Sequence, residues 1–236
     1  MNRDIKQLEE SLGYSFRDKK LLKNALIHRS YGNENWKYKN INNERLELLG
    51  DAVLDLVVAE YLYKIFANST EGELAKIKSM AVSEPILARV SKGLCMGEYL
   101  LLSKGEEMTG GRERSSILGD VFEAVLGAIY LDSDFHSVKE VALRHMKYWI
   151  DNIDTNDEIL DYKTILQEYT QKEKKIVPTY EVLTESGPDH MKTFEIVVKI
   201  GIDILGRGIG KNKKLAEQAA AKDLIKKLGV KVNETL

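Results

Sequence analysis

The stretch Asn43-Glu44-Arg45-Leu46-Glu47-Leu48-Leu49-Gly50-Asp51-Ala52-Val53-Leu54-Asp55 combines apolar and acidic residues at helical spacing. Its acids are Glu44, Glu47, Asp51 and Asp55. They fall at i, i+3, i+7 and i+11, so they lie along one face of a helix. Like charges at this spacing repel, and a bound divalent cation would remove that cost. The alternative is an ordinary solvated helix face, which is the commoner origin of such a pattern.

A second acidic segment favours a cation site over a solvated face. Leu118-Gly119-Asp120-Val121-Phe122-Glu123-Ala124 places two acids at i and i+3 inside an otherwise apolar helix. Acidic side chains are rarely buried unless they are paired or bind a metal. Gly50 and Gly119 each precede an aspartate, and we expect glycines at both helix crossings to let the backbones approach closely. The two segments together predict one site for a hard cation.

The composition indicates a globular protein and limits the kinds of metal site that the chain can form. The chain has 236 residues, 43% hydrophobic and 31% charged, which suits one large or two small globular domains and argues against disorder. Its single cysteine, Cys95, excludes an intramolecular disulfide and a cysteine-cluster metal site, and we expect it in the core. Oxygen ligands favour Mg²⁺, with Mn²⁺ as the alternative ion. No apolar run is long enough for a membrane span and no signal-peptide pattern opens the chain, so we expect a cytoplasmic protein.

The first 150 residues have the apolar periodicity of helices throughout. The helical blocks are Leu21 to Ile27, Arg45 to Ile65, Glu71 to Met80, Glu84 to Leu94, Ile117 to Tyr130 and Val138 to Ile150. Pro85 follows Ser83-Glu84, a natural place for proline in a first helical turn. We therefore expect an all-α domain over residues 1–150, and a linker over residues 151–160, where Asn and Asp gather.

The pattern changes after the linker. Residues 161–174 are helical, Thr179 to Thr184 is extended, and Thr193 to Ile200 alternates as a half-buried strand does. A third strand at Ile204 to Gly208 precedes a helix from Lys213 to Leu228, which Gly229 ends. The sequence predicts a small α+β domain of order α-β-β-β-α over residues 161–230. Residues 161–236 carry a net charge of +3 and residues 1–160 a net charge of −5, which indicates two different roles.

The stretch from Asn43 to Leu54 resembles the signature of the ribonuclease III family, and Gly119 to Gly127 resembles its second acidic motif. The resemblance implies that Glu47, Asp51, Asp120 and Glu123 are Mg²⁺ ligands. Asp51 and Glu123 would then be the catalytic positions whose loss most damages cleavage. It also implies auxiliary acids at Glu44 and Glu71. Leu48 stands where many relatives carry a phenylalanine that plugs into the partner subunit, so an apolar plug is kept.

The carboxyl-terminal domain resembles the double-stranded RNA-binding module that bacterial members of this family carry. Double-stranded RNA is read through its minor groove and phosphates, and lysines at a helix N-terminus suit phosphate. A solvated lysine-rich helix face is the alternative. The resemblance implies these RNA-binding residues: Thr164, Gln167, Glu168 and Gln171 on the first helix, His190 in the loop after Gly187-Pro188, and Lys211, Lys213 and Lys214 before and within the last helix.

The resemblance implies a homodimeric, Mg²⁺-dependent endoribonuclease for double-stranded RNA. It implies products with 5′-phosphate and 3′-hydroxyl ends, and the processing of ribosomal, messenger and transfer RNA precursors. Divalent metal held by carboxylates suits phosphodiester hydrolysis without a histidine base, so we expect a structural hydrogen-bonding role for His28. Two alternatives remain: an RNA-binding protein that kept this fold but lost catalysis, and an acid-rich interaction scaffold with a nucleic-acid-binding tail.

Overall fold

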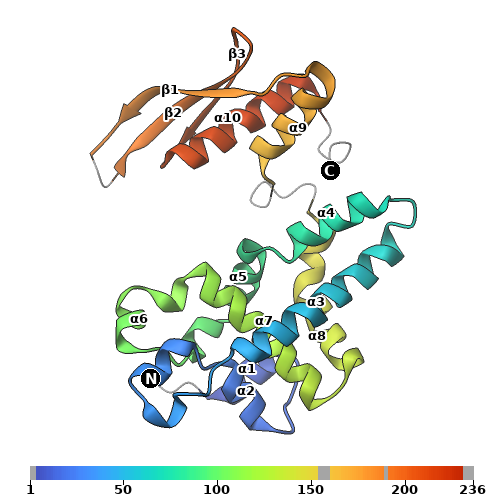
Figure 1. Ribbon diagram of the computed structural model, residues 1–236, viewed down its shortest axis with the longest axis vertical. Helices are drawn as coiled ribbons and strands as arrows, with labels where there is room; N and C mark the ends of the chain where they lie inside the picture. The colour runs from blue at the N-terminus through green and yellow to red at the C-terminus, as the bar shows by residue number, and fades with distance from the viewer. Residues whose placement is uncertain (1–3, 154–159, 189–190, 231–236) are drawn as a thin grey trace. The chain divides into compact units, whose positions relative to one another are not determined.

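The computed structural model describes residues 4–153, 160–188 and 191–230, and it divides the chain into two compact units. The first unit comprises Met1–Ile153 and the second Asp154–Leu236. Figure 1 shows helices alone as the labelled elements of the first unit, and a sheet with two helices in the second. Among the described residues, no helix is both long enough and apolar enough to cross a membrane.

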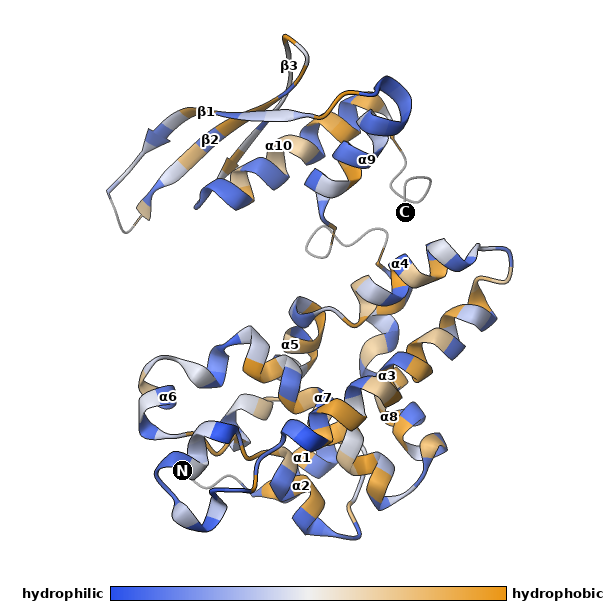
Figure 2. Ribbon diagram, viewed as in Figure 1, coloured by the Kyte–Doolittle hydropathy of each residue, from blue (hydrophilic) through white to orange (hydrophobic). Residues whose placement is uncertain are grey.

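The first unit is built from eight α-helices and four short 3-10 helices within residues 4–153. The α-helices are α1 (Ile5–Leu12), α2 (Lys19–Ala25), α3 (Glu44–Ile65), α4 (Glu71–Ala81), α5 (Glu84–Gly93), α6 (Lys104–Met108), α7 (Ser115–Asp132) and α8 (Phe135–Asp151). The 3-10 helices are η1 (Arg29–Asn33), η2 (Trp36–Tyr38), η3 (Met96–Tyr99) and η4 (Gly111–Glu113). Helix α7 is the core of this unit, and Figure 2 shows hydrophobic residues along it. Its apolar side chains, such as Phe122 and Leu126, are fully buried.

Glycines set the contact between α3 and α7, the most extensive helix contact in the unit. A Cβ atom at Gly50 would lie 1.7 Å from the backbone oxygen of Glu123, and one at Gly127 would lie 2.2 Å from that of Leu46. The predicted close approach at Gly50 is therefore confirmed. The prediction for Gly119 is wrong: its nearest neighbours are side-chain atoms of Leu87 and Glu84 at 3.8 and 3.9 Å. Gly127, one turn after Glu123, is the second glycine of the crossing.

The second unit has the predicted order of elements. Helix α9 (Tyr162–Lys174) precedes β1 (Thr179–Ser186), β2 (Thr193–Ile200) and β3 (Asp203–Gly210), and α10 (Lys213–Leu228) ends the unit. The sheet is antiparallel with β2 in the centre. Glycines again allow close packing, because a Cβ atom at Gly208 would lie 2.1 Å from the backbone nitrogen of Ala220 in α10. Gly229 ends α10 in the left-handed conformation, as expected.

The structure also contains elements that the apolar period did not indicate. Helix α1 begins after Asp4, whose side chain accepts a hydrogen bond from the Lys6 amide, and ends at Gly13 in the left-handed conformation. Both are standard end signals for a helix, so the sequence contained the information. The expectation that Cys95 lies in the core is wrong. It is exposed in the left-handed region with φ of 54°, at the turn between α5 and η3.

Candidate functional site

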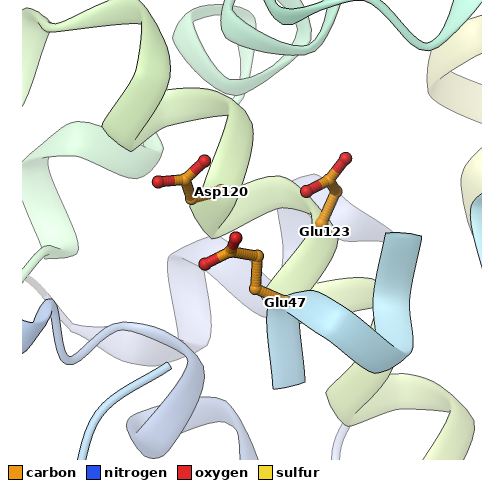
Figure 3. Close-up of side chains that lie close together, drawn as sticks. All are labelled: Glu47, Asp120 and Glu123. Carbon is orange, nitrogen blue, oxygen red and sulfur yellow. The ribbon is translucent and has the colours of Figure 1, made fainter. Parts of the chain in front are cut away.

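Three carboxylates meet where α3 crosses α7. Glu47 comes from α3, and Asp120 and Glu123 come from successive turns of α7 (Figure 3). One carboxylate oxygen of each lies within 4.8 Å of the others. The backbone contact at Gly50 and Gly127 brings the helices close enough for this, because a larger residue at either position would push the two helices apart.

Electrostatic repulsion within this cluster is visible in the pKa values. Burial, followed by the charges of Asp51 and Glu47, raises the pKa of Glu123 from 4.5 to about 8. Burial and then the Asp120 charge raise the pKa of Glu47, and burial and then the Glu84 charge raise that of Asp120. The pKa of each of the three carboxyl groups is therefore raised, and nearby positive charge would favour their ionised forms.

The donor set suits a hard divalent cation. The cluster offers only oxygen ligands, because three carboxylates from two helices place their oxygens near one another. Arg29 is the nearby cation that opposes the rise in pKa at Glu47 and Asp120, but its side chain is 72% exposed to solvent. A bound divalent ion would lower the pKa of all three carboxylates.

The other predicted acids lie outside this group of three. Asp51 is exposed on the next turn of α3, although its charge acts on Glu123. Glu44, at the start of α3, accepts a hydrogen bond from Asn42 at 2.9 Å and lies 3.5 Å from Arg29. Glu71 is exposed in the first turn of α4, directly after Thr70, which forms a capping box with Glu73.

Asp55, the last acid of the predicted stripe, has a basic partner on a neighbouring helix. Lys78 of α4 donates a hydrogen bond to its Oδ2 at 2.6 Å, although the charge of Asp55 still helps to raise the pKa of Glu123. Sequence reasoning also missed Glu84, which acts on Asp120 from the first turn of α5. The segment Ser83-Glu84-Pro85 indicated only the start of a helix, and no local pattern reveals which distant helix an acidic side chain faces.

His28 has the structural role that was expected. Its Nδ1 lies 2.8 Å from the Ser30 hydroxyl and accepts a hydrogen bond from the Ser30 amide at 3.3 Å. Ser30 in turn accepts a hydrogen bond from the Ser103 amide, which ties η1 to the segment before α6. Burial lowers the pKa of His28, so the ring is neutral at pH 7.

Seven of the eight predicted RNA-binding residues lie among the described residues, on two parts of the second unit. Lys211, Lys213 and Lys214 are exposed at and before the start of α10, where Asn212 caps the helix. On α9, Thr164, Gln167 and Gln171 are exposed and Glu168 is half-buried. His190 lies outside the described residues.

The beginnings of the two helices of this unit are joined by polar side chains. Gln218 of α10 donates a hydrogen bond to Asp161, the residue before α9, at 2.7 Å. Glu217 accepts one from Lys163 at 2.7 Å. Neither link was expected from the sequence, since a tertiary contact between exposed polar residues leaves no periodic signal.

Two family models match the chain. One describes a ribonuclease-III-like domain and matches residues 18–148; the other describes a double-stranded RNA binding motif and matches residues 162–228. A Ribonuclease 3 of Fusobacterium nucleatum subsp. nucleatum is 58% identical over 234 residues, which cover 99% of this chain and 100% of that protein. A Ribonuclease 3 of Nitratiruptor sp. is 45% identical and covers 95% of this chain and 96% of that protein.

The fold comparison agrees with the sequence comparison. A solved nuclease domain of ribonuclease III from Campylobacter jejuni, described for flexibility in a region involved in dimer formation, is 47% identical. It matches with a TM-score of 0.58 and covers 61% of this chain and 97% of that domain. With both family models matched in order and relatives similar over nearly the whole chain, this chain belongs to the ribonuclease III family.

Proposed function

We propose that this protein is an endoribonuclease that hydrolyses double-stranded RNA with Mg²⁺ and leaves 5′-phosphate and 3′-hydroxyl ends. The observation that carries the proposal is the convergence of Glu47, Asp120 and Glu123 within 4.8 Å, with the pKa of Glu123 raised to about 8. Neither an RNA-binding protein without catalysis nor an acidic scaffold requires three mutually repelling carboxylates in a half-buried place. A nuclease does, because it must hold a cation there.

Each side chain has a separate task in this proposal. Glu47, Asp120 and Glu123 hold the ion through carboxylate oxygens, and Asp51 is the proposed fourth ligand. When bound, the divalent ion activates water at neutral pH and stabilises charge that develops on the phosphodiester. The lysines at the start of α10 and the exposed side chains of α9 bind the duplex through its phosphates and minor groove. Mn²⁺ suits the same oxygen ligands.

The second part of the proposal is a homodimer. Leu48, Leu56 and Tyr63 are 74%, 57% and 75% exposed on α3. The first two are eight residues apart and Tyr63 seven further on, so all three share one helix face. Apolar side chains gathered on one exposed face are typical of a protein interface. Sedimentation of the full chain should give a dimer, and Leu48→Glu should shift it towards monomer.

The function is tested by a gel assay of a long RNA duplex with purified full-length protein, with Mg²⁺ and with a chelator. We expect cutting of the duplex only with Mg²⁺, and no cutting of a single-stranded control. The end chemistry is read by ligation, since RNA ligase requires a 5′-phosphate and a 3′-hydroxyl. A stable uncut complex across Mg²⁺ and Mn²⁺ would instead favour the binding protein. The proposed place of action is the cytoplasm, where ribosomal, messenger and transfer RNA precursors are the expected substrates.

A further inference from the structure

A pocket of about 350 Å³ opens beside the carboxylate cluster. Glu47 and Asp120 belong both to the cluster and to the wall of this pocket. Other parts of the wall come from the start of η1, from α6 and from the first turns of α3 and α7. Anything bound in the pocket would therefore lie next to the reacting phosphodiester.

Two long helices begin at this pocket. Helix α3 has 22 residues and α7 has 18, and neither has a side-chain hydrogen bond at its N-cap. The first amides of a helix have no partner within the helix, and the helix dipole adds positive potential there. Two such ends facing one pocket favour an anion, although helix ends alone do not identify a ligand.

The independent sign of a ligand is Asn43, the N-cap residue of α3. Its side chain is 2% exposed and lines the pocket, and its Nδ2 has no hydrogen-bond partner. A buried amide without a partner costs roughly the free energy of a lost hydrogen bond. A hydrogen-bond acceptor on a bound ligand would remove this cost, which gives the unpartnered amide a functional explanation.

The wall of the pocket carries four acids, Glu44, Glu47, Glu106 and Asp120, and two arginines, so an anion fits it when a divalent cation is bound at the carboxylate cluster. Glu44 is 3.5 Å from Arg29, and Glu106 accepts a hydrogen bond from Arg114. Of the two arginines, Arg114 is held by Glu106 and Thr109, whereas the ion pair of Arg29 within the described residues is the long contact with Glu44. Arg29 is therefore the cation best able to turn towards a ligand.

We propose that this pocket binds a phosphate of the RNA backbone next to the phosphodiester that is cut, and that Asn43 and Arg29 position it. The inference rests on the proposed function, because the phosphate belongs to the RNA substrate. The amide of Asn43 and the guanidinium group of Arg29 donate hydrogen bonds to its oxygens. Both are positioning residues, and neither touches the reacting atoms.

The test uses RNA duplexes in which one phosphate near the cleavage site is replaced by an uncharged methylphosphonate, one position at a time. We expect wild-type cleavage to fall about tenfold at one position beside the cut, the usual size for one charged hydrogen bond. Arg29→Gln and Asn43→Asp should each cut the unmodified duplex about tenfold more slowly. The cleavage rate of these variants should fall little further when the phosphate at that same position is replaced by methylphosphonate.

Three controls separate positioning from folding. Lys37→Gln makes the same charge change on exposed η2 and should cut as the wild type does. Arg29→Lys keeps the charge and should regain part of the rate. Arg29 is exposed, so its variants test the pocket even where Asn43→Asp unfolds.

If each methylphosphonate reduces cleavage by Arg29→Gln by the same factor as cleavage by the wild type, the inference is overturned. The nuclease proposal would still stand. A wild-type protein that cuts no duplex at all would overturn both. The coupled loss at a single position would support the phosphate site.

Discussion

Both units use glycines to bring two elements into close contact, but the acidic side chains of the two units differ in their charge environment. In the first unit, Gly50 and Gly127 let α3 and α7 touch, and the contact gathers carboxylates whose pKa values are raised. In the second unit, Gly208 lets α10 lie on β3, and several acids of that unit have lysine partners, such as Glu217 with Lys163 and Asp223 with Lys227. Close packing therefore serves stability in both units, but among the described residues the carboxyl groups with a raised pKa all belong to the first unit. That difference indicates which unit binds the cation.

The largest expected effect comes from removing one carboxylate of the cluster. Glu123→Gln should reduce cleavage of duplex RNA by about a thousandfold, or about 4 kcal/mol in activation free energy. The amide cannot supply a charged ligand, whereas the RNA-binding unit is untouched. Gel-shift titration in Ca²⁺ should give the wild-type affinity. Equal losses of RNA binding and cleavage would contradict the proposal that the first unit cuts the RNA and the second unit binds it.

Gly50→Ala should lower the free energy of unfolding by at least about 2 kcal/mol, because its Cβ would meet the Glu123 backbone oxygen at 1.7 Å. Chemical denaturation measures the loss. Gly72→Ala is the matched control in α4, since nothing lies within 4 Å of its Cβ position. Gly208→Ala should be similarly destabilising in the other unit and should weaken RNA binding. A stable, active Gly50→Ala protein would contradict the account of the crossing.

The raised pKa of Glu123 gives a pH dependence with a definite sign. Its folded value of about 8 exceeds the ordinary 4.5, so the metal-free folded state holds the proton more tightly than the unfolded chain. The contribution of protonated Glu123 to the free energy of unfolding should be complete below pH 4.5 and should be lost as the pH rises from 4.5 to 8. Glu123→Gln lacks this loss. The variant should gain about 1–2 kcal/mol relative to wild type between pH 5 and 9, a value reduced for solvent screening of a partly exposed group. Chemical denaturation of both proteins at pH 5 and pH 9, with chelator present, measures this difference in the free energy of unfolding.

Lys213→Gln and Lys214→Gln probe the second unit. Each should weaken duplex binding to a similar extent for all sequences and should lower the slope of log affinity against log salt by about 1. The lysines would contact phosphate, which carries no sequence information. Binding titrations at several salt concentrations measure the slope. An unchanged slope would identify these lysines as an ordinary solvated face.

The smallest effect is expected where an acid already has a partner. Lys78→Gln removes the partner of Asp55, and Lys163→Gln that of Glu217. All four side chains are partly exposed, so each variant should cost less than about 1 kcal/mol of unfolding free energy. A larger loss for Lys78→Gln would mean that its ion pair with Asp55 contributes more to folding than a partly exposed pair usually does.

Much of the fold was predictable because the apolar period is strong. The strand Thr193 to Ile200 and the helix Lys213 to Leu228 have the predicted ends, whereas the outer strands and helices α7 and α8 are longer than expected. Helix α1 was missed although Asp4 and Gly13 signal its ends. Local pattern also indicated that Gly50 contacts another backbone, since a glycine inside a helix needs a reason.

The candidate site was less predictable, since it depends on which side chains face each other across helices. Helical spacing places Asp55 beside Asp51, but only the tertiary structure gives it Lys78 as a partner. In the same way, spacing cannot reveal that Gly127 replaces Gly119 at the crossing or that Glu84 acts on Asp120. The unpartnered amide of Asn43 is also invisible in the sequence.

The most direct test of the central claim is the melting temperature of full-length protein at pH 8, for wild type and Glu123→Gln, with chelator and with Mn²⁺. With chelator the variant should melt at the higher temperature, because it lacks the repelling carboxylate. With Mn²⁺ the wild type should rise above the variant, because a bound cation stabilises the folded state. If Mn²⁺ shifts both proteins equally, the cluster is not the cation site and the account is wrong.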